Sequence, residues 1–173
     1  MLEKVIVIGC SGSGKSTFSI KLAQLTKLPL FHLDNIWWRN DKTHIERSEF
    51  DQKLSEIMQG DKWIIDGDYS RTYEVRIKEA NTIIFLDFPL RVCLDGIKKR
   101  VGTKRSDIPF LESELDPELI NQVNEKYSKN RSMVYLLKEK YQSKEWIIFN
   151  SHEEVASWLN NLEESLCPQQ KHI

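Results

Sequence analysis

The stretch Gly9-Cys10-Ser11-Gly12-Ser13-Gly14-Lys15-Ser16-Thr17, which follows the apolar run Val5-Ile6-Val7-Ile8, decides the fold of this chain. It has the pattern G-x-x-x-x-G-K-[ST]. Its glycines let backbone N–H groups turn inward around a phosphate, and the following helix directs its positive dipole end at the same anion. Lys15 is expected to reach the β- and γ-phosphates of a nucleotide, and Ser16 to bind Mg²⁺ through its hydroxyl. The predicted phosphate-binding residues are Gly9, Ser11, Gly12, Ser13, Gly14, Lys15, Ser16 and Thr17.

The residues on either side favour this interpretation over a simple turn of small residues. The β-branched residues before Gly9 predict a buried strand. Phe18, Leu22 and Leu25 then recur at helical spacing and mark one apolar face of a helix. A strand, a glycine-rich loop and a helix in this order form the setting that the motif requires.

Composition limits the class of protein. The chain has 173 residues, enough for one domain with an ordinary core, so we expect a single domain over residues 1–173. The net charge of -1 provides no overall attraction to nucleic acid or anionic lipid, and we expect no direct sequence-specific binding of nucleic acid. Cys10, Cys93 and Cys167 form no C-x-x-C pair, which favours a reducing cytosol. No apolar stretch approaches the roughly 20 residues that cross a bilayer, so the expected location is cytoplasmic.

Short apolar strands alternate with helical patterns along the chain, which predicts an α/β domain with a parallel sheet between helices. The strands are expected at residues 5–8, 30–33, 63–65, 82–86 and 146–149. Asp116 and Pro117 form a typical helix start, and Ser151-His152-Glu153-Glu154 has the spacing of a capping box. Ligands of such sheets bind beyond the carboxyl ends of the strands. The residues that follow each strand are therefore the candidates for a site.

Carboxylates follow the second and third predicted strands. Asp34 and Asp66 are expected at the edge of the sheet where the phosphates bind. In phosphoryl transfer one carboxylate helps to fix the water shell of Mg²⁺, and another orients or deprotonates an acceptor hydroxyl. We assign Asp66 to the metal and Asp34 to the acceptor, although these roles are exchangeable at this point and Asp34 alternatively caps a helix. Asp87 ends an apolar run in the same way but ranks lower because Pro89 follows it, and Asp68 is interpreted as a turn or cap residue.

Arginine is well suited to clamp phosphoryl oxygens because its planar guanidinium binds two oxygens at once. The candidates are Arg47, Arg71, Arg100, Arg105 and Arg131. Arg71 lies directly beyond the third strand and is assigned to the transferred phosphoryl group and the acceptor, while Arg47 opens a helix beside the acceptor pocket. The last three flank residues 101–115, a long polar stretch that we predict to be a closing lid. Arg100 is assigned to the nucleotide, Arg105 to the phosphoryl group and Arg131 to the acceptor. The alternative is that these residues form a solvated basic face.

Aromatic residues lie near the same strand ends. Trp37 and Trp38 either stack on an acceptor or form core and pocket wall, since aromatic side chains mostly serve burial. Tyr69, just after the third strand, is counted among the acceptor-side residues. A nucleoside monophosphate demands phosphate-binding arginines, whereas a hydroxylated metabolite needs a base such as Asp34. The sequence contains parts of both sets.

Five segments, GCSGSGKST, HLDNIWW, RSEF, WIIDGDYSRT and NTIIFLDFPLRVCL, together resemble the DNA topology modulation proteins over roughly residues 2–160. These proteins are P-loop kinase-like relatives of the adenylate kinase and shikimate kinase group. The resemblance implies a three-layer P-loop NTPase fold of the nucleoside monophosphate kinase type, with five parallel strands in the order 2-3-1-4-5 and a lid between the fourth and fifth strands. It also implies ATP with Mg²⁺, and a second small-molecule site near Asp34, Arg47, Asp66 and Arg71.

Two positions depart from the family pattern. Gly96 stands where relatives tend to carry an arginine in the helix after the fourth strand, and Ser106 stands where they tend to carry a proline after the lid arginine. Lys99, Arg100 or Arg105 are the candidates to replace the missing cation. Without a replacement, the charge of the transition state would be poorly stabilised and phosphoryl transfer would be slow.

Two functions follow from these patterns. The first is a kinase that transfers the γ-phosphoryl group of Mg-ATP to a nucleotide or a small hydroxylated metabolite. The second is an ATP-binding or slowly hydrolysing regulator with an indirect effect on DNA topology, which Gly96 and the family name favour. ATP is expected rather than GTP because no base-reading N-K-x-D motif is present.

Overall fold

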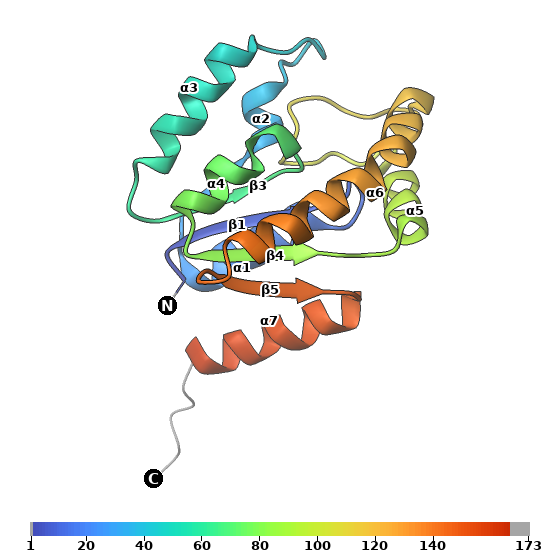
Figure 1. Ribbon diagram of the computed structural model, residues 1–173. Coiled ribbons are helices and arrows are strands. Elements are labelled where there is room, and N and C mark those ends of the chain that lie inside the picture. Colours follow the sequence, from blue (N-terminus) through green and yellow to red (C-terminus); the bar gives the residue numbers. More distant parts are fainter. Residues whose placement is uncertain (1, 167–173) are drawn as a thin grey trace.

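A sheet of five parallel strands forms the centre of the computed structural model, which describes residues 2–166 (Figure 1). The strands are β1 (Lys4–Gly9), β2 (Leu30–His32), β3 (Trp63–Asp66), β4 (Thr82–Leu86) and β5 (Glu145–Phe149). They lie in the order β2-β3-β1-β4-β5, and each neighbouring pair is parallel. The predicted α/β fold and strand order are confirmed. Cys167 lies outside the described residues.

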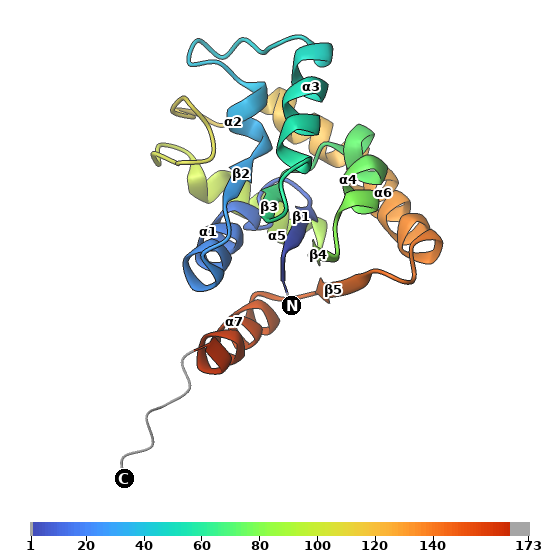
Figure 2. The same ribbon diagram turned by 90° about the vertical axis from the view of Figure 1, so that its left-hand side faces the viewer.

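Helices cover both faces of the sheet, as the two views show (Figures 1 and 2). The helices are α1 (Lys15–Thr26), α2 (Leu33–Trp37), α3 (Arg47–Met58), α4 (Tyr73–Glu79), α5 (Leu90–Arg100), α6 (Pro117–Lys140) and α7 (His152–Leu166), with a 3₁₀ turn η1 (Ser70–Thr72) before α4. Within residues 2–166, no helix is both long and apolar enough to span a membrane.

Each face of the sheet has its own apolar core. On one face, Phe18 and Leu22 of α1 join Phe149 and α7, with the rings of Phe18 and Trp158 at a centroid distance of 5.9 Å. On the other face, α3, α4 and α6 pack on β1, β3 and β4. The strands in the middle of the sheet are buried on both sides, which is why they read as continuous apolar runs without alternation. The two cores hold the carboxyl ends of the strands at one common edge.

One strand boundary differs from the prediction. The second strand ends at His32, and Leu33 begins the short helix α2. Leu33 is fully buried and lies against Gly67, where an added Cβ would be 2.8 Å from the Leu33 Cβ. The apolar character of Leu33 therefore reflects burial at a helix start. The helices α2 and α4 were not expected, because elements of this length are too short to show a helical period.

The predicted helix starts of α6 and α7 are confirmed by their hydrogen bonds. Asp116 accepts a hydrogen bond from the backbone N–H of Glu118 at 2.8 Å and so caps α6. Ser151 accepts one from the backbone N–H of Glu154 at 3.2 Å. The returning bond of the box goes from the N–H of Asn150 to the Glu154 carboxylate at 2.7 Å, one residue earlier than expected.

Candidate functional site

The loop between β1 and α1 forms a hydrogen-bonded turn at the carboxyl edge of the sheet. The Ser13 N–H donates to the carbonyl of Cys10 at 3.1 Å, and the Lys15 ammonium donates to the same carbonyl at 2.9 Å. The helix α1 begins at Lys15, and its N-cap Gly14 is in the left-handed region. No side chain caps this helix start, and its first turn contains no acidic residue. The first N–H groups of α1 are therefore free to bind an anion.

The same loop packs directly on α5. Gly12 has a φ of 82°, and a Cβ added there would lie 2.0 Å from the carbonyl oxygen of Cys93. A Cβ added at Gly96 would lie 2.0 Å from the carbonyl oxygen of Gly12. Two glycines thus let a helix touch the loop backbone. The glycine at position 96 has a packing reason, and an arginine side chain does not fit there in this arrangement.

A cleft of about 1460 Å³ opens above the loop and the neighbouring strand ends. This volume exceeds the roughly 300–1,000 Å³ of a typical small-molecule site, so the cleft has room for more than one ligand. Among the predicted site residues, those that line it are Gly9, Ser11, Gly12, Gly14, Lys15, Ser16, Thr17, Asp34, Trp37, Arg47, Asp66, Tyr69, Arg71, Arg100, Arg105 and Arg131. Ser13 is the exception, because its side chain is buried beneath the loop and its hydroxyl has no hydrogen-bond partner.

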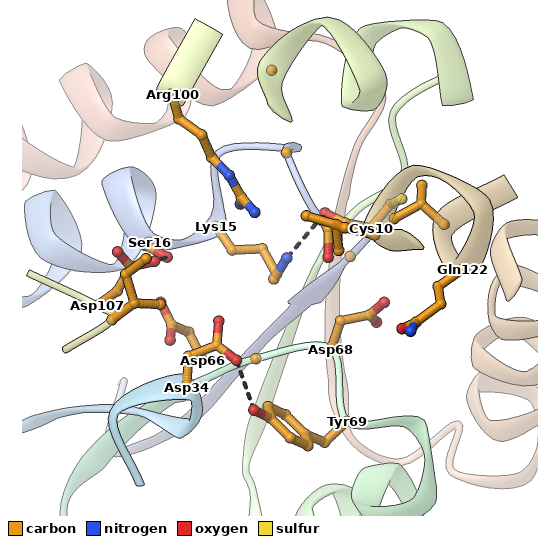
Figure 3. A pocket seen from close by; sticks show the side chains of 18 of the residues that line it. Cys10, Lys15, Ser16, Asp34, Asp66, Asp68, Tyr69, Arg100, Asp107 and Gln122 are labelled. Atoms are coloured by element: carbon orange, nitrogen blue, oxygen red, sulfur yellow. Dashed lines mark hydrogen bonds between the residues drawn. The ribbon is translucent and has the colours of Figure 1, made fainter. Parts of the chain in front are cut away.

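Carboxylates form the floor of the cleft (Figure 3). The Lys15 side chain extends toward Cys10, and Asp34, Asp66 and Asp68 lie below it in this view. Asp34 is in the first turn of α2, and its Oδ1 accepts a hydrogen bond from the Tyr69 hydroxyl at 2.7 Å. Burial raises the pKa of Asp34 above the ordinary value for aspartate. A half-buried carboxyl that shares the cleft with Lys15 is chemically suited to accept a proton.

Asp66 has a different environment from Asp34. Its two carboxylate oxygens lie 2.9 and 3.0 Å from Nδ1 of His32, and its side chain is buried at the end of β3. Burial acts to lower the pKa of His32, but the hydrogen bond with Asp66 outweighs it and raises that pKa. Asp66 is thus held by a neighbouring strand, whereas Asp34 is held by a tyrosine.

Two residues at the end of β3 contribute more than the sequence indicated. Asp68 was interpreted as a turn residue, but it faces the cleft near Lys15 and accepts a hydrogen bond from the Tyr73 hydroxyl. Burial raises the pKa of Asp68. Arg76 is fully buried beneath it and donates to the carbonyls of Gly67 and Tyr69 at 3.1 and 3.3 Å. Burial lowers the pKa of Arg76 to about 10. Asp68 could be found from its spacing to Asp66, but the partners of Arg76 appear only in three dimensions.

Residues 101–116 have no regular helix or strand and cross one side of the cleft beside α2 (Figure 2). The side chain of Asn35 donates to the carbonyl of Ser106 at 2.7 Å, and Trp38 contacts Phe110 edge-to-face at 5.9 Å. Asp107, which sequence analysis missed, is buried and accepts a hydrogen bond from the Ser16 hydroxyl. The predicted lid segment therefore touches the loop at the residue assigned to Mg²⁺.

An ion-pair network holds this segment together. Arg105 donates to Asp107 and also to Glu112, the latter at 2.7 Å, and Arg100 donates to Glu112 at 2.9 Å. Burial acts to raise the pKa of Asp107, but the hydrogen bonds from Arg105 and Ser16 outweigh it and lower that pKa. Arg100 and Arg105 both line the cleft, and they are connected to Ser16 through Glu112 and Asp107.

The other predicted arginines, Arg47, Arg71 and Arg131, have no hydrogen bond or ion pair with this network among the described residues. Arg71 is half exposed and donates to both carboxylate oxygens of Asp51 at 2.6 and 2.9 Å. Arg131 donates to both oxygens of the buried Asp87 at 2.7 and 2.8 Å, so Asp87 is occupied by α6. Arg47 begins α3 and lines the cleft.

Solved structures of small-molecule kinases have a similar fold. A shikimate kinase from Acinetobacter baumannii, in complex with shikimate, is 13% identical with a TM-score of 0.62, and the match covers 99% of this chain and 97% of that one. A sugar kinase from Janibacter sp. HTCC2649 is 20% identical with a TM-score of 0.55, covering 96% and 93%. A gluconokinase from Sinorhizobium meliloti 1021 is 14% identical with a TM-score of 0.56, covering 95% and 91%.

No protein-family model and no curated protein matches the chain. At identities of 13–20% the likeness extends to the fold alone. The chemistry of the site therefore depends on the residues of this chain alone. The chain has the five-stranded parallel α/β fold, in the order 2-3-1-4-5, that shikimate kinases and gluconokinases share.

Proposed function

We propose that the protein is a kinase that transfers the γ-phosphoryl group of Mg-ATP to a nucleotide or a small hydroxylated molecule. The observation that carries this proposal is that Lys15 and Asp34 face one cleft from different elements. Lys15 belongs to a loop with the phosphate-binding pattern, and Asp34 is a half-buried carboxyl held by Tyr69. A phosphoryl donor and a hydroxyl acceptor need these two kinds of group beside each other.

The loop would bind ATP through its backbone. The uncapped start of α1 and the N–H groups of the loop provide donors for the β- and γ-phosphates, and Lys15 would exchange its bond to the Cys10 carbonyl for a phosphate oxygen. ATP is preferred over GTP because the sequence has no base-reading N-K-x-D motif. Arg100 lies on the opposite side of Lys15 from the three aspartates (Figure 3) and would contact the nucleotide.

The oxygen-rich edge near Ser16 fits Mg²⁺. Ser16 and Asp66 would hold the ion, since hydroxyl and carboxylate oxygens are ligands that Mg²⁺ prefers and Asp107 already lies against Ser16. Residues 2–166 contain no cluster of three or more His, Cys, Asp or Glu that forms a metal cage, and Mg²⁺ at kinase sites is bound by few side chains together with phosphates. When bound, Mg²⁺ would neutralise charge on the phosphoryl oxygens.

Asp34 would act on the acceptor. Tyr69 fixes one of its carboxylate oxygens, and the raised pKa of Asp34 makes it a better proton acceptor than an exposed aspartate once it is ionised. Arg105 and the predicted lid over residues 101–115 would close over the reacting groups and stabilise their charge, and Arg71 would contribute only after leaving its ion pair with Asp51. We infer the lid from the contacts that join Asp107 to Ser16.

A second candidate is an ATP-binding or slowly hydrolysing regulator, as the resemblance to the DNA topology modulation proteins suggests. The specific observation in its favour is that Arg100 and Arg105 are both paired with carboxylates, while position 96 has no room for a cation. We also infer a cytoplasmic location and no direct sequence-specific contact with nucleic acid. These inferences rest on the charge balance and composition of the chain.

Mg-ATP turnover tests the proposal. ADP formation is measured with nucleoside monophosphates, nucleosides and small hydroxy compounds, and the Lys15→Ala variant serves as the blank for contaminating activity. The kinase proposal predicts that one acceptor raises ADP formation about tenfold or more above the rate without acceptor. ATP binding without any acceptor-dependent turnover would instead favour the regulator.

A further inference from the structure

We propose that the acceptor is an uncharged hydroxylated molecule with a flat apolar face, such as a ring sugar or a nucleoside, and not a phosphorylated compound. This inference rests on the proposed kinase function and concerns one part of the same cleft. We call this part the acceptor half. It consists of Asp34, Trp37, Arg47, Phe50, Asp68, Tyr69 and Arg71.

The arginines around the acceptor half are already neutralised. Arg71 makes a two-point ion pair with Asp51, and Arg131 makes one with Asp87. The lid arginines share carboxylates within their own segment. Among the described arginines that line the cleft, only Arg47 lacks a carboxylate partner. A phosphate monoester carries about 1.5–2 negative charges at neutral pH, and unpaired bidentate arginines are its usual partners. The acceptor half offers one.

The carboxylates of the acceptor half also disfavour binding of a phosphorylated acceptor. Asp34 and Asp68 both lie on the cleft floor. When ionised they repel a phosphate, and when protonated they are neutral and provide no attraction. Lys15 belongs to the phosphate-binding loop and Arg76 is buried with its guanidinium on backbone carbonyls, so the two carboxylates of the acceptor half face one unpaired guanidinium, that of Arg47. Lys42, Lys104 and Lys126 line the cleft outside the acceptor half. The local charge therefore disfavours an anionic acceptor.

Aromatic rings supply the complementary surface. Phe50 and Tyr69 stack at a centroid distance of 5.0 Å, and Trp37 meets Phe50 edge-to-face at 5.5 Å. Phe50 is buried, while Trp37 and Tyr69 are partly exposed and line the cleft. Such a wall binds the apolar face of a sugar ring or a nucleobase. The Tyr69 hydroxyl joins this wall to Asp34, so a ring held there presents its hydroxyls to the base.

The reaction balances with these groups. The acceptor oxygen forms a bond to the γ-phosphorus, and the bond from that phosphorus to the β,γ-bridging oxygen breaks, so ADP leaves with the electron pair. The hydroxyl proton passes to Oδ2 of Asp34, because Oδ1 already accepts from Tyr69. Solvent then removes this proton. The phosphorylated product carries the charge that the acceptor half disfavours, which helps its release.

Matched pairs of acceptors test the proposal with Mg-ATP and the full-length chain. The pairs are adenosine and AMP, cytidine and CMP, ribose and ribose 5-phosphate, and glucose and glucose 6-phosphate. The expected result is that kcat/KM for the uncharged member of the productive pair exceeds that of its phosphorylated partner by about tenfold or more. The nucleoside and sugar arms distinguish the two sources of a flat hydroxylated ring.

Preference for the phosphorylated member would overturn this inference and leave the kinase function intact. Absence of turnover with every pair, in a protein that still binds Mg-ATP, would overturn both. Asp51→Asn adds a charge test because it releases Arg71 from its partner. This variant is expected to lower the ratio of kcat/KM between the uncharged and the phosphorylated acceptor by about threefold. The matched control is Asp95→Asn, which changes an exposed carboxylate on α5 and is expected to leave this ratio unchanged. Unchanged discrimination in Asp51→Asn would contradict the role given to the ion pair.

Discussion

The donor half of the cleft, residues 9–17, and the acceptor half are built by different means. In the donor half, backbone N–H groups bind the ligand, and their positions follow from glycines and from the uncapped start of α1. In the acceptor half, side chains from α2, α3 and the end of β3 meet. A site built from one contiguous backbone segment is local in sequence, whereas a site built from distant side chains depends on tertiary packing. A substitution in one half should therefore impair the function of that half, either ATP binding or acceptor-dependent turnover, and leave the other intact.

The largest effect is expected at the acceptor half. Asp34→Asn removes the proton acceptor and should lower kcat by about 10²–10⁴-fold. Burial raises the pKa of Asp34, and the base acts when ionised, so activity should fall as pH drops through a value above the ordinary aspartate pKa of about 3.9. The measurement is the pH profile of kcat/KM. A variant that keeps wild-type turnover and the same acid limb would remove Asp34 from the mechanism.

Gly96→Ala should break the donor half through packing. The new Cβ would lie 2.0 Å from the Gly12 carbonyl oxygen, so α5 or the loop must move. We expect a loss of about 2–3 kcal/mol in the free energy of unfolding together with weaker ATP binding, measured by denaturant titration and calorimetry. Gly60→Ala is the control because its nearest neighbour would be 3.3 Å away. Equal stability of the two variants would show that α5 does not press on the loop.

Asp107→Asn should loosen the predicted lid. It removes the charge that pairs with Arg105 and accepts from Ser16, at a cost of about 1–2 kcal/mol. The pKa of Asp107 is lowered in the folded protein, so its contribution is present above the unfolded pKa and is lost as pH falls through the folded value. Limited proteolysis by trypsin at Lys104 and Arg105 should become faster than in Glu114→Gln, an exposed control from the same segment. No change in the cleavage rate would contradict the role of the Asp107 contacts with Ser16 and Arg105 in holding the segment.

Arg71→Ala should have the smallest effect on stability. Its ion pair with Asp51 is half exposed, and such pairs contribute about 0.2–1 kcal/mol. The expected change in the free energy of unfolding is correspondingly small, and it should vanish at high salt because exposed charges are screened. Chemical denaturation at low and high salt measures it. A loss well above this range would mean that Arg71 has a structural role that its exposure does not suggest.

The sequence predicts the donor half well because its chemistry lies in one stretch, and the structure has the expected strand, loop and helix there. Asp66 ends β3 as predicted, whereas Asp34 lies in the first turn of α2, two residues after β2. Both still line the same cleft because parallel strands bring their carboxyl ends to one edge. Asp107 could not be predicted, since its partner Ser16 lies 91 residues earlier. From the sequence, Gly96 was interpreted as the loss of a cation. In the structure, Gly96 is required for the packing of α5 on the loop.

The pairing of charges was also invisible in the sequence. From the sequence, Arg71 and Arg131 were predicted to bind phosphoryl or acceptor groups. In the structure they form ion pairs with Asp51 of α3 and with Asp87 after the end of β4. Local patterns do not show which of several acidic residues a long arginine side chain reaches. Specificity in the acceptor half is therefore the part of the account that depends most on tertiary structure.

Calorimetric titration of Mg-ATP into the wild type, Lys15→Ala and Asp34→Asn, with turnover measured on the same samples, tests the separation of the two halves most directly. We expect Lys15→Ala to weaken Mg-ATP binding about tenfold or more. We expect Asp34→Asn to bind Mg-ATP within about twofold of the wild type while acceptor-dependent turnover is lost. Equal loss of binding in both variants would contradict the account, because one carboxylate would then serve the donor site as well.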